Sequence, residues 1–374
     1  MSKLFETTSI NGMKIANRFV RSATWEGMAT TDGAVTPKLI DTITNLAKGG
    51  VGLIISGHTY VSTEGQGSPW QLGIYKDELI DGLKALTSSV HKKGGKIVMQ
   101  LAHAGKFAPK DLINRPPLIV SKLNDFAESS QKEMTPEEIQ RIVTDFAGAA
   151  RRAKSAGFDG VQIHSAHGYL LSQFLSPLHN KRQDKYGGNI QNRAKIHLEI
   201  YHAVRELVGS GYPFLIKMNC EDMGENGLSP EDFLQAAKMF ADVGFDAIEL
   251  SGGITRAGKF SPIRTGINSE DKEAYFKKYA HLLKKEVNVP LMLVGGIRSF
   301  EVADRLITEG VADYISMSRP FIREPDLINR WKSGDRQKAK CISENSCFDP
   351  GMNGKGIYCV TKEREEKGGK HENN

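Results

Sequence analysis

The chain has 374 residues, of which 39% are hydrophobic and 25% charged, as in an ordinary globular protein that buries a large core. Its 50 Lys and Arg exceed its 44 Asp and Glu by 6, and this small excess is spread along the chain, which argues against a nucleic-acid partner. With four cysteines, no apolar run near the ~20 residues that span a bilayer and no secretory leader, it is expected to be a cytoplasmic enzyme without a membrane partner.

The first element expected is a hairpin within residues 4–17, because Ile10-Asn11-Gly12-Met13 contains a turn sequence that favours hairpins. From residue 19 onward, short apolar runs alternate with longer stretches of helical period. Nearly continuous apolar runs are typical of parallel strands that are covered on both faces. The strand candidates, in chain order, are Phe19–Thr24, Val51–Gly57, Lys96–His103, Gly160–Ala166, Phe214–Cys220, Ala247–Gly252, Pro290–Gly295 and Tyr314–Ser318.

Helix boundaries between these strands are also readable. Thr135-Pro136-Glu137-Glu138 and Ser229-Pro230-Glu231-Asp232 each place a capping hydroxyl before Pro and acidic residues, and Lys48-Gly49-Gly50 marks a helix end. Alternating strands and helices predict a parallel sheet, and this number of units favours a closed (β/α)8 TIM barrel of the α/β class over an open doubly wound sheet. We expect a single domain, with the barrel in residues 1–335, the hairpin as a cap on its bottom, and a C-terminal extension in residues 336–374.

Polar residues follow nearly every predicted strand, and the active site of such a barrel lies at the carboxyl ends of its strands. The residues at these ends are Thr24-Trp25-Glu26, Gly57-His58, Gln100–His103, His164 with His167 and Tyr169, Lys217–Glu221, Ser251-Gly252-Gly253, Gly295-Gly296-Ile297-Arg298 and Ser318-Arg319. Buried polar groups cost stability unless they have partners. These strand ends are therefore the candidate site.

The last two strand ends indicate a phosphate site, which in such barrels lies after the seventh and eighth strands. Gly295 and Gly296 would let backbone N–H groups approach an anion, and Arg298 and Arg319 would supply paired guanidinium donors. The alternative is a tight turn with two surface arginines. The two features together favour phosphate binding.

His164 and His167 form a second candidate group, since two imidazoles three residues apart converge if the chain turns helical between them. They could donate hydrogen bonds to a substrate oxygen, ligate a metal with His103 or Glu221 as a further ligand, or be satisfied polar residues under a loop. Tyr169 adds a phenol that could donate a proton.

Three late cysteines, Cys341, Cys347 and Cys359, suggest a metal or cluster site, but iron–sulfur clusters usually require four thiolates. Glu344 stands where a second cysteine of a C-x-x-C pair would be needed. We therefore expect an incomplete cysteine motif in the extension and no bound metal.

Longer motifs carry a family likeness. They are Asn17-Arg18-Phe19-Val20, Gln100-Leu101-Ala102-His103-Ala104-Gly105, the run from His164 to Pro177, the run from Asn180 to Gly188, and Ile315-Ser316-Met317-Ser318-Arg319-Pro320. By these motifs, the chain from Leu4 to Trp331 resembles the Old Yellow Enzyme family of flavin-dependent oxidoreductases. Within that family it is similar to the NADH:flavin oxidoreductases and to the N-terminal barrel of 2,4-dienoyl-CoA reductase.

The resemblance implies that FMN binds without covalent linkage at the mouth of the barrel. The implied FMN contacts are Ala23, Thr24, Trp25 and Gly57 at the isoalloxazine, Gln100 at its pyrimidine edge, Lys217 beside N1, and Arg298, Ser318 and Arg319 at the phosphate. His164 and His167 match the pair that hydrogen-bonds a substrate oxygen, and Tyr169 matches the proton donor. Trp25 departs from the family, in which a smaller residue is common, and Lys217 stands where many members have arginine.

The implied activity is that of an FMN-dependent NAD(P)H oxidoreductase of the ene-reductase type, which reduces an activated alkene or a similar electron-poor acceptor. NADH or NADPH would have to use the same pocket, because no Gly-x-Gly-x-x-Gly motif follows a strand. Three alternatives stay open: a flavin-dependent amine or alcohol dehydrogenase, a metal-dependent barrel lyase or hydrolase, and a flavin-binding protein without catalysis. The substrate is expected to be a small molecule, and homo-oligomerisation is left open.

Overall fold

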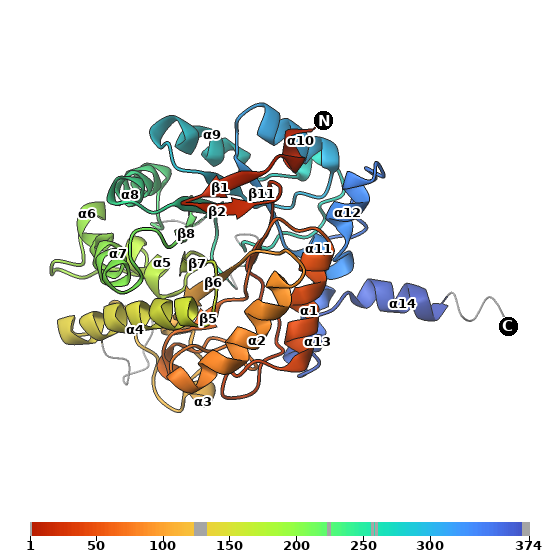
Figure 1. Cartoon of the computed structure of the whole chain (residues 1–374). Helices are drawn as coiled ribbons and strands as arrows, with labels where there is room; N and C mark the ends of the chain where they lie inside the picture. Colours follow the sequence, from red (N-terminus) through yellow and green to blue (C-terminus); the bar gives the residue numbers. More distant parts are fainter. Residues whose placement is uncertain (1, 123–132, 223–225, 256–257, 259–260, 369–374) are drawn as a thin grey trace.

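Parallel strands close into a barrel in the computed structural model, which describes residues 2–122, 133–222, 226–255, 258 and 261–368 (Figure 1). The barrel strands are β3 (Phe19–Arg21), β4 (Leu53–Ile55), β6 (Ile97–Ala102), β7 (Gly160–Ser165), β8 (Phe214–Asn219), β9 (Ala247–Ser251), β10 (Leu291–Leu293) and β11 (Tyr314–Met317). Neighbouring strands pair in parallel, and the ring closes where Ser316 of β11 lies opposite Val20 of β3. Each predicted strand contains one of these strands, which confirms the (β/α)8 barrel.

A further short strand was not predicted. This strand, β5 (Thr59–Tyr60), pairs in parallel with the end of β6, where Thr59 lies opposite Leu101. It lengthens the wall of the barrel at the carboxyl end, directly after His58. Its sequence gave no separate signal because strands of two residues are too short to show a period.

Helices surround the barrel (Figure 1). The longer ones are α1 (Pro37–Lys48), α2 (Ile80–His91), α4 (Pro136–Ser155), α7 (Lys195–Val208), α8 (Pro230–Val243), α9 (Lys277–Glu286), α10 (Phe300–Thr308) and α14 (Val360–Gly368). The shorter ones are α3 (Lys110–Ile113), α5 (Leu170–Leu175), α6 (Ile190–Arg193), α11 (Arg319–Arg323), α12 (Leu327–Lys332) and α13 (Asp349–Met352). No helix in the described ranges is long and apolar enough to cross a membrane.

The predicted helix caps are confirmed. The Thr135 hydroxyl accepts a hydrogen bond from the backbone N–H of Glu138, whose carboxylate accepts one from the N–H of Thr135, which is a complete capping box for α4. Ser229 caps α8 through the N–H of Asp232, and α1 ends at Lys48 with Gly49 as its C-cap. These local signals fix where helices start and stop around the barrel.

The predicted hairpin covers the bottom of the barrel. It consists of β1 (Thr8–Ile10) and β2 (Met13–Ile15), joined by Asn11 and Gly12 at φ values of 43° and 78°, the left-handed conformations of a tight hairpin turn. Ile10, Met13 and Ile15 are buried in a separate cluster with apolar residues of the barrel interior, among them Val20, Leu53, Val98, Leu215 and Met292. The amino ends of the strands are therefore sealed, and the carboxyl ends remain open.

The C-terminal segment lies against the open end of the barrel. The Ala339 N–H donates to the Arg298 carbonyl and the Ile357 N–H to the Glu26 carbonyl, both at 2.9 Å. Helix α14 has no buried residue and projects away from the barrel (Figure 1). The division of the chain between residues 335 and 336 stays a prediction.

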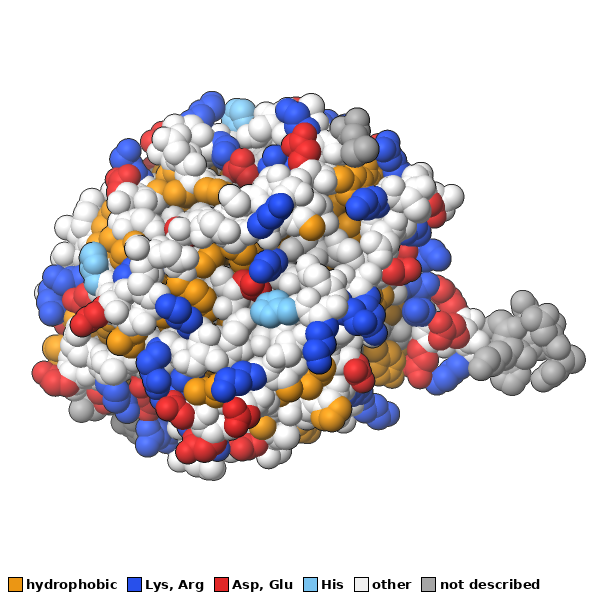
Figure 2. Space-filling model, in the orientation of Figure 1, with side chains coloured by type: hydrophobic (Ala, Val, Ile, Leu, Met, Phe, Trp, Pro, Cys, Tyr) orange, Lys and Arg blue, Asp and Glu red, His pale blue; other side chains and the backbone are white. Residues whose placement is uncertain are grey.

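Charge of both signs is mixed over the surface. On the face shown in Figure 2, blue Lys and Arg groups are interspersed with red Asp and Glu groups. This mixture agrees with the small net charge of +6. It resembles an ordinary solvated surface more than a basic stripe.

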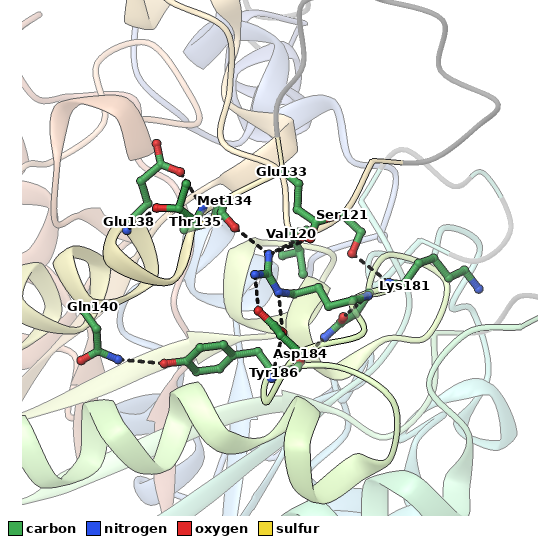
Figure 3. Close-up of polar contacts among 12 residues, drawn as sticks. Val120, Ser121, Glu133, Met134, Thr135, Glu138, Gln140, Lys181, Asp184 and Tyr186 are labelled. Atoms are coloured by element: carbon green, nitrogen blue, oxygen red, sulfur yellow. Dashed lines mark hydrogen bonds and ion pairs between the residues drawn. The ribbon is translucent and has the colours of Figure 1, made fainter.

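Arg182 fastens the segment after α5 to the loop before α4. Figure 3 labels Val120, Glu133, Met134 and Asp184 in this region. The Arg182 guanidinium donates to the carbonyls of Val120 (3.0 Å) and Met134 (2.7 Å) and to the carboxylate of Asp184, and it forms an ion pair with Glu133. Only 3% of its side chain is exposed. The guanidinium thus joins the segment after α5 to the loop that precedes α4.

Replacement of Arg182 with Ala is expected to lower the free energy of unfolding by about 3–5 kcal/mol, because it leaves buried carbonyls and a carboxylate without their donor. Urea denaturation followed by circular dichroism measures this change. The matched control is Arg151→Ala, which removes only an exposed ion pair with Asp77 and should cost less than about 1 kcal/mol. Equal losses in the two variants would contradict the role given to Arg182.

Candidate active site

A cavity opens at the carboxyl ends of the strands and collects most of the predicted site residues. Those that line it are Ala23, Thr24, Trp25, Gln100, His164, His167, Tyr169, Lys217, Gly296, Arg298, Ser318 and Arg319. Gly57 and Gly295 are not among the lining residues. The C-terminal segment contributes Ser343 and Phe348 to the wall, which the sequence did not indicate.

Gly57 and Gly295 lie behind the cavity wall and have structural partners. The Gly57 N–H donates to Glu26, whose carboxylate leaves no room for a side chain on Gly57, and the Gly295 carbonyl accepts from the N–H of Tyr275 at 3.2 Å. Glu26 also forms a buried ion pair with Arg21 at 2.8 Å. A close approach of the protein's own carboxylate therefore accounts for glycine at position 57.

The two predicted histidines and the tyrosine converge on one point. The ring centroids of His164 and His167 are 5.2 Å apart, and those of His164 and Tyr169 are 4.8 Å apart. Between the histidines the chain leaves β7 through a left-handed turn rather than a helical one, with φ of 62° at His167 and 80° at Gly168. This turn folds the chain back, so that both imidazoles face the cavity.

Hydrogen bonds hold this group in place. His167 Nε2 lies 2.7 Å from the Ser251 hydroxyl, and the His167 backbone N–H donates to the Asn219 side chain at 3.0 Å. The Tyr169 hydroxyl lies 3.2 Å from Nε2 of His58. His58 and Ser251 are among the strand-end residues named from the sequence, but the sequence gave them no role. Their partners are 111 and 84 residues away along the chain, and contacts over such separations leave no local sequence pattern.

His164 and His167 are neutral at physiological pH. Burial lowers the pKa of His164 and His167 well below the usual value, and the nearby charge of Lys217 lowers it further. A neutral imidazole carries one N–H donor and one acceptor nitrogen. The buried Nδ1 of His164 has no hydrogen-bond partner in the described part of the chain, so it is available to a bound molecule.

A line of buried polar groups runs through the barrel interior to the cavity. The Gln100 amide donates to Gln162 at 2.7 Å, and Gln162 donates to Glu249 at 3.1 Å. Lys217 is 3.4 Å from Glu249 and donates to the Ser22 hydroxyl at 2.8 Å. These contacts hold the ammonium of Lys217 and the amide of Gln100 at the base of the cavity.

Arg298 and Arg319 both line the cavity, as does Gly296. Gly296 has a φ of 74°, and a Cβ there would come within 2.8 Å of the Tyr275 ring, so glycine is required for this close turn. Nε of Arg298 is buried without a partner within the described residues, as is the hydroxyl of Ser316. This donor set fits a phosphate group, as the sequence predicts.

Trp25 forms one side wall. Its ring would be within 2.9 Å of a Cβ on Gly27 and within 2.8 Å of one on Gly351, and its indole N–H donates to the Pro69 carbonyl at 3.1 Å. The indole is therefore wedged between the barrel and the C-terminal segment. Its size is accommodated by glycine on both sides.

The remaining metal candidates do not gather at this site. Neither His103 nor Glu221 lines the cavity: the Nδ1 of His103 accepts from the Gly105 N–H at 3.0 Å, and Glu221 accepts a hydrogen bond from Tyr279. Cys341, Cys347 and Cys359 line a second, smaller pocket with Glu344. No group of three or more His, Cys, Asp or Glu among the residues described here is arranged to hold a metal ion.

The buried histidines also predict how stability depends on pH. Burial lowers the pKa of His197 from 6.5 to about 3, so the unfolded chain binds this proton first as the pH falls. The stabilisation is therefore complete above pH 6.5 and declines toward pH 3, at about 1.4 kcal/mol per pH unit. His197→Gln should flatten this decline in urea titrations between pH 7 and 4.

His281→Gln is the control for this titration, because His281 is exposed on α9. It should follow the wild-type curve. The hydrogen bond between His197 and the Ser165 hydroxyl, at 2.7 Å, can be replaced by the glutamine amide. Parallel curves for His197→Gln and the wild type would contradict the assignment.

With this geometry in place, comparison with known proteins decides the family. The model of the NADH:flavin oxidoreductase / NADH oxidase family matches residues 3–338. This chain belongs to that family. The expected cofactors, FMN with NADH or NADPH, agree with the description of this family and of its NADPH dehydrogenase members.

Individual relatives support the assignment. A protein named NADH oxidase from Thermoanaerobacter brockii is 36% identical over 347 residues, which are 91% of this chain and 52% of the relative. NADPH dehydrogenase from Geobacillus sp. is 37% identical over 325 residues, 86% of this chain and 91% of the relative. A solved Old Yellow Enzyme homologue from Zymomonas mobilis has a TM-score of 0.76 at 29% identity, covering 90% of this chain and 94% of the other.

The family assignment confirms the resemblance stated from the sequence, and it confirms that the chain is an oxidoreductase. The chain spans about half the length of the NADH oxidase relative and most of the length of the NADPH dehydrogenase relative. Relatives of both lengths therefore share this barrel.

Proposed function

We propose that this chain is an FMN-dependent NAD(P)H oxidoreductase that reduces activated alkenes or similar electron-poor acceptors. The observation that carries the proposal is the neutral His164, His167 and Tyr169 group in the same cavity as the Arg298 and Arg319 cradle. The phosphate cradle would fix one end of FMN, and the imidazoles would hold the substrate at the other.

FMN, when bound, supplies the hydride that it has received from NADH or NADPH. His164 and His167 would each donate an N–H to the carbonyl or nitro oxygen of the substrate, where negative charge develops during reduction. Neutral imidazoles suit this task because their N–H groups stabilise the charge without giving up a proton. Tyr169 would supply a proton to the α-carbon of the substrate.

Lys217 and Gln100 would contact the ring system at the base of the cavity. The ammonium of Lys217 is held by Glu249 and Ser22, as described above, which places a fixed positive charge beside the proposed ring position. Ala23, Thr24 and Trp25 would pack beside the ring, and Ser318, whose hydroxyl lies 2.7 Å from that of Thr24, would join the arginines at the phosphate.

The purified protein should be yellow, with flavin absorbance near one equivalent per chain, and should oxidise NADH or NADPH when an enone, maleimide or nitroalkene is added. Titration with a para-substituted phenol should give a long-wavelength charge-transfer band, because the phenolate would bind the two imidazoles above the flavin. A protein that does not bind flavin would contradict the proposal. So would a protein that binds flavin but does not oxidise NADH or NADPH with any of these acceptors. Oxidation of amines or alcohols instead would favour a dehydrogenase.

The other partner predictions remain proposals. A small-molecule substrate fits the cavity and the family. We also propose, from the sequence, a cytoplasmic location and the absence of a nucleic-acid partner. The oligomeric state is left open, and gel filtration with light scattering measures it.

A further inference from the structure

A third imidazole lies in the cavity beside the proposed proton donor. His58 follows β4, lines the cavity and is half-buried. Its Nε2 is 3.2 Å from the Tyr169 hydroxyl, with the two ring centroids 5.3 Å apart. The His58 ring centroid is 6.5 Å from that of His164, so three imidazoles and one phenol form a continuous group.

The backbone around His58 is fixed by Gln71. The Gln71 amide donates to the His58 carbonyl at 2.9 Å, and its oxygen accepts from the N–H groups of Gly67 and Ser68. Gln71 is 1% exposed. Gly67 in turn lies so close to Tyr169 that a Cβ there would be 3.2 Å from the ring. One buried amide therefore sets the position of His58 and of the loop that packs on Tyr169.

The protonation state of His58 suits a donor. Burial lowers its pKa to about 4, so the ring is neutral and Nε2 carries a proton in one of two tautomers. His167 Nε2 is already engaged with Ser251 at 2.7 Å. Of these three histidines, His58 is the one within hydrogen-bond distance of the Tyr169 oxygen in the structure.

We propose that His58 is a positioning residue for Tyr169: its Nε2–H donates to the phenol oxygen, turns the hydroxyl proton toward the cavity and stabilises the phenolate left after proton transfer. In that step the Tyr169 O–H bond breaks and a C–H bond forms at the substrate α-carbon, which supplies the electron pair. Water then reprotonates the phenolate. The inference rests on the proposed function.

A double-mutant cycle with Tyr169 tests the coupling between the two side chains. Stopped-flow spectroscopy follows flavin reduction by NADH and reoxidation by cyclohexenone in the wild type, His58→Leu, Tyr169→Phe and the double variant. We expect His58→Leu to slow reoxidation by the enone about tenfold or more, as for loss of a hydrogen bond to a developing charge. In the Tyr169→Phe background the same substitution should change the rate less than about twofold.

Three further measurements separate positioning from a general structural effect. His58→Gln places an amide N–H near the position of the histidine Nε2 and should recover most of the rate. Reoxidation by ferricyanide, a one-electron acceptor that needs no proton from tyrosine, should be unchanged in His58→Leu. His202→Leu, which removes an exposed imidazole on α7, should behave as the wild type.

The outcomes separate this inference from the proposed function. If the wild type binds FMN but reduces no enone, the proposed function fails. If the wild type reduces enones and His58→Leu is unaffected, or slows the reaction equally with and without the Tyr169 hydroxyl, only the role of His58 is overturned. If His58→Leu does not fold, His58→Gln and its double variant with Tyr169→Phe complete the cycle: loss of the Tyr169-dependent rate in His58→Gln overturns the inference.

Discussion

His164→Ala is expected to slow enone reduction by about 10²–10³-fold while FMN remains bound, since one preorganised N–H donor to the developing charge is lost. The physical basis is the buried, neutral ring of His164, whose Nδ1 lacks a partner among the described residues. The flavin phosphate would be held by arginines at the other end of the cavity. Stopped-flow reoxidation of the reduced flavin by an enone measures the loss directly.

Two companion measurements sharpen this test. Phenol titration of His164→Ala should give a much weaker charge-transfer band, because the phenolate would also lose one donor. His164→Asn, which restores an N–H, should recover part of both signals. If NADH-dependent flavin reduction suffers while reoxidation by the enone is untouched, the role of His164 is wrong.

Arg298→Ala is expected to raise the Kd for FMN by about 10²–10³-fold, the effect of removing a buried, charge-assisted phosphate contact. Arg298 is 6% exposed and its Nε has no partner in the described residues, so a donor is left for the anion. Its other nitrogens donate to the carbonyls of Ile267 and Ala339, which orient the guanidinium. Fluorescence titration of the flavin-free protein measures the affinity.

Riboflavin distinguishes phosphate binding from damage to the cavity, since it has the same ring system without the phosphate. Arg298→Ala should leave riboflavin affinity within about twofold of the wild type. Arg298→Lys should recover only part of the FMN affinity, because an ammonium lacks the bidentate geometry of guanidinium. Equal loss of affinity for FMN and for riboflavin would contradict a phosphate role for Arg298. The control is Arg305→Ala, which removes an exposed ion pair with Glu270 and should leave both affinities unchanged.

The barrel could be predicted because its signals are local. Apolar runs such as Val51–Gly57, which contains β4, indicate buried parallel strands, and Asn11-Gly12 specified the hairpin turn. Once the strands were placed, the rule that strand carboxyl ends share one mouth brought Arg298, Arg319 and His164 to the same cavity. Most of the site followed from order along the chain and one geometric rule.

What could not be predicted depends on side-chain direction and on the path of the loops. The contact of His58 with Tyr169 joins two loops, and the left-handed turn at His167 has no composition signal at a non-glycine residue. The hydrogen bond from the Gly57 N–H to Glu26 was not predicted either, and a contact of Gly57 with the flavin stays a prediction. The C-terminal segment gave only an incomplete cysteine motif, although Ser343 and Phe348 reach the cavity wall.

The sealed bottom of the barrel has a kinetic consequence. Because Ile10, Met13 and Ile15 fill the space beneath the strands in the described part of the chain, molecules would reach the proposed ring through the opposite mouth. NADH or NADPH and the acceptor would therefore bind at the same site in turn. The oxidised nicotinamide would have to dissociate before the acceptor binds. On the proposed function, we expect ping-pong kinetics, in which each reactant at high concentration inhibits the binding of the other.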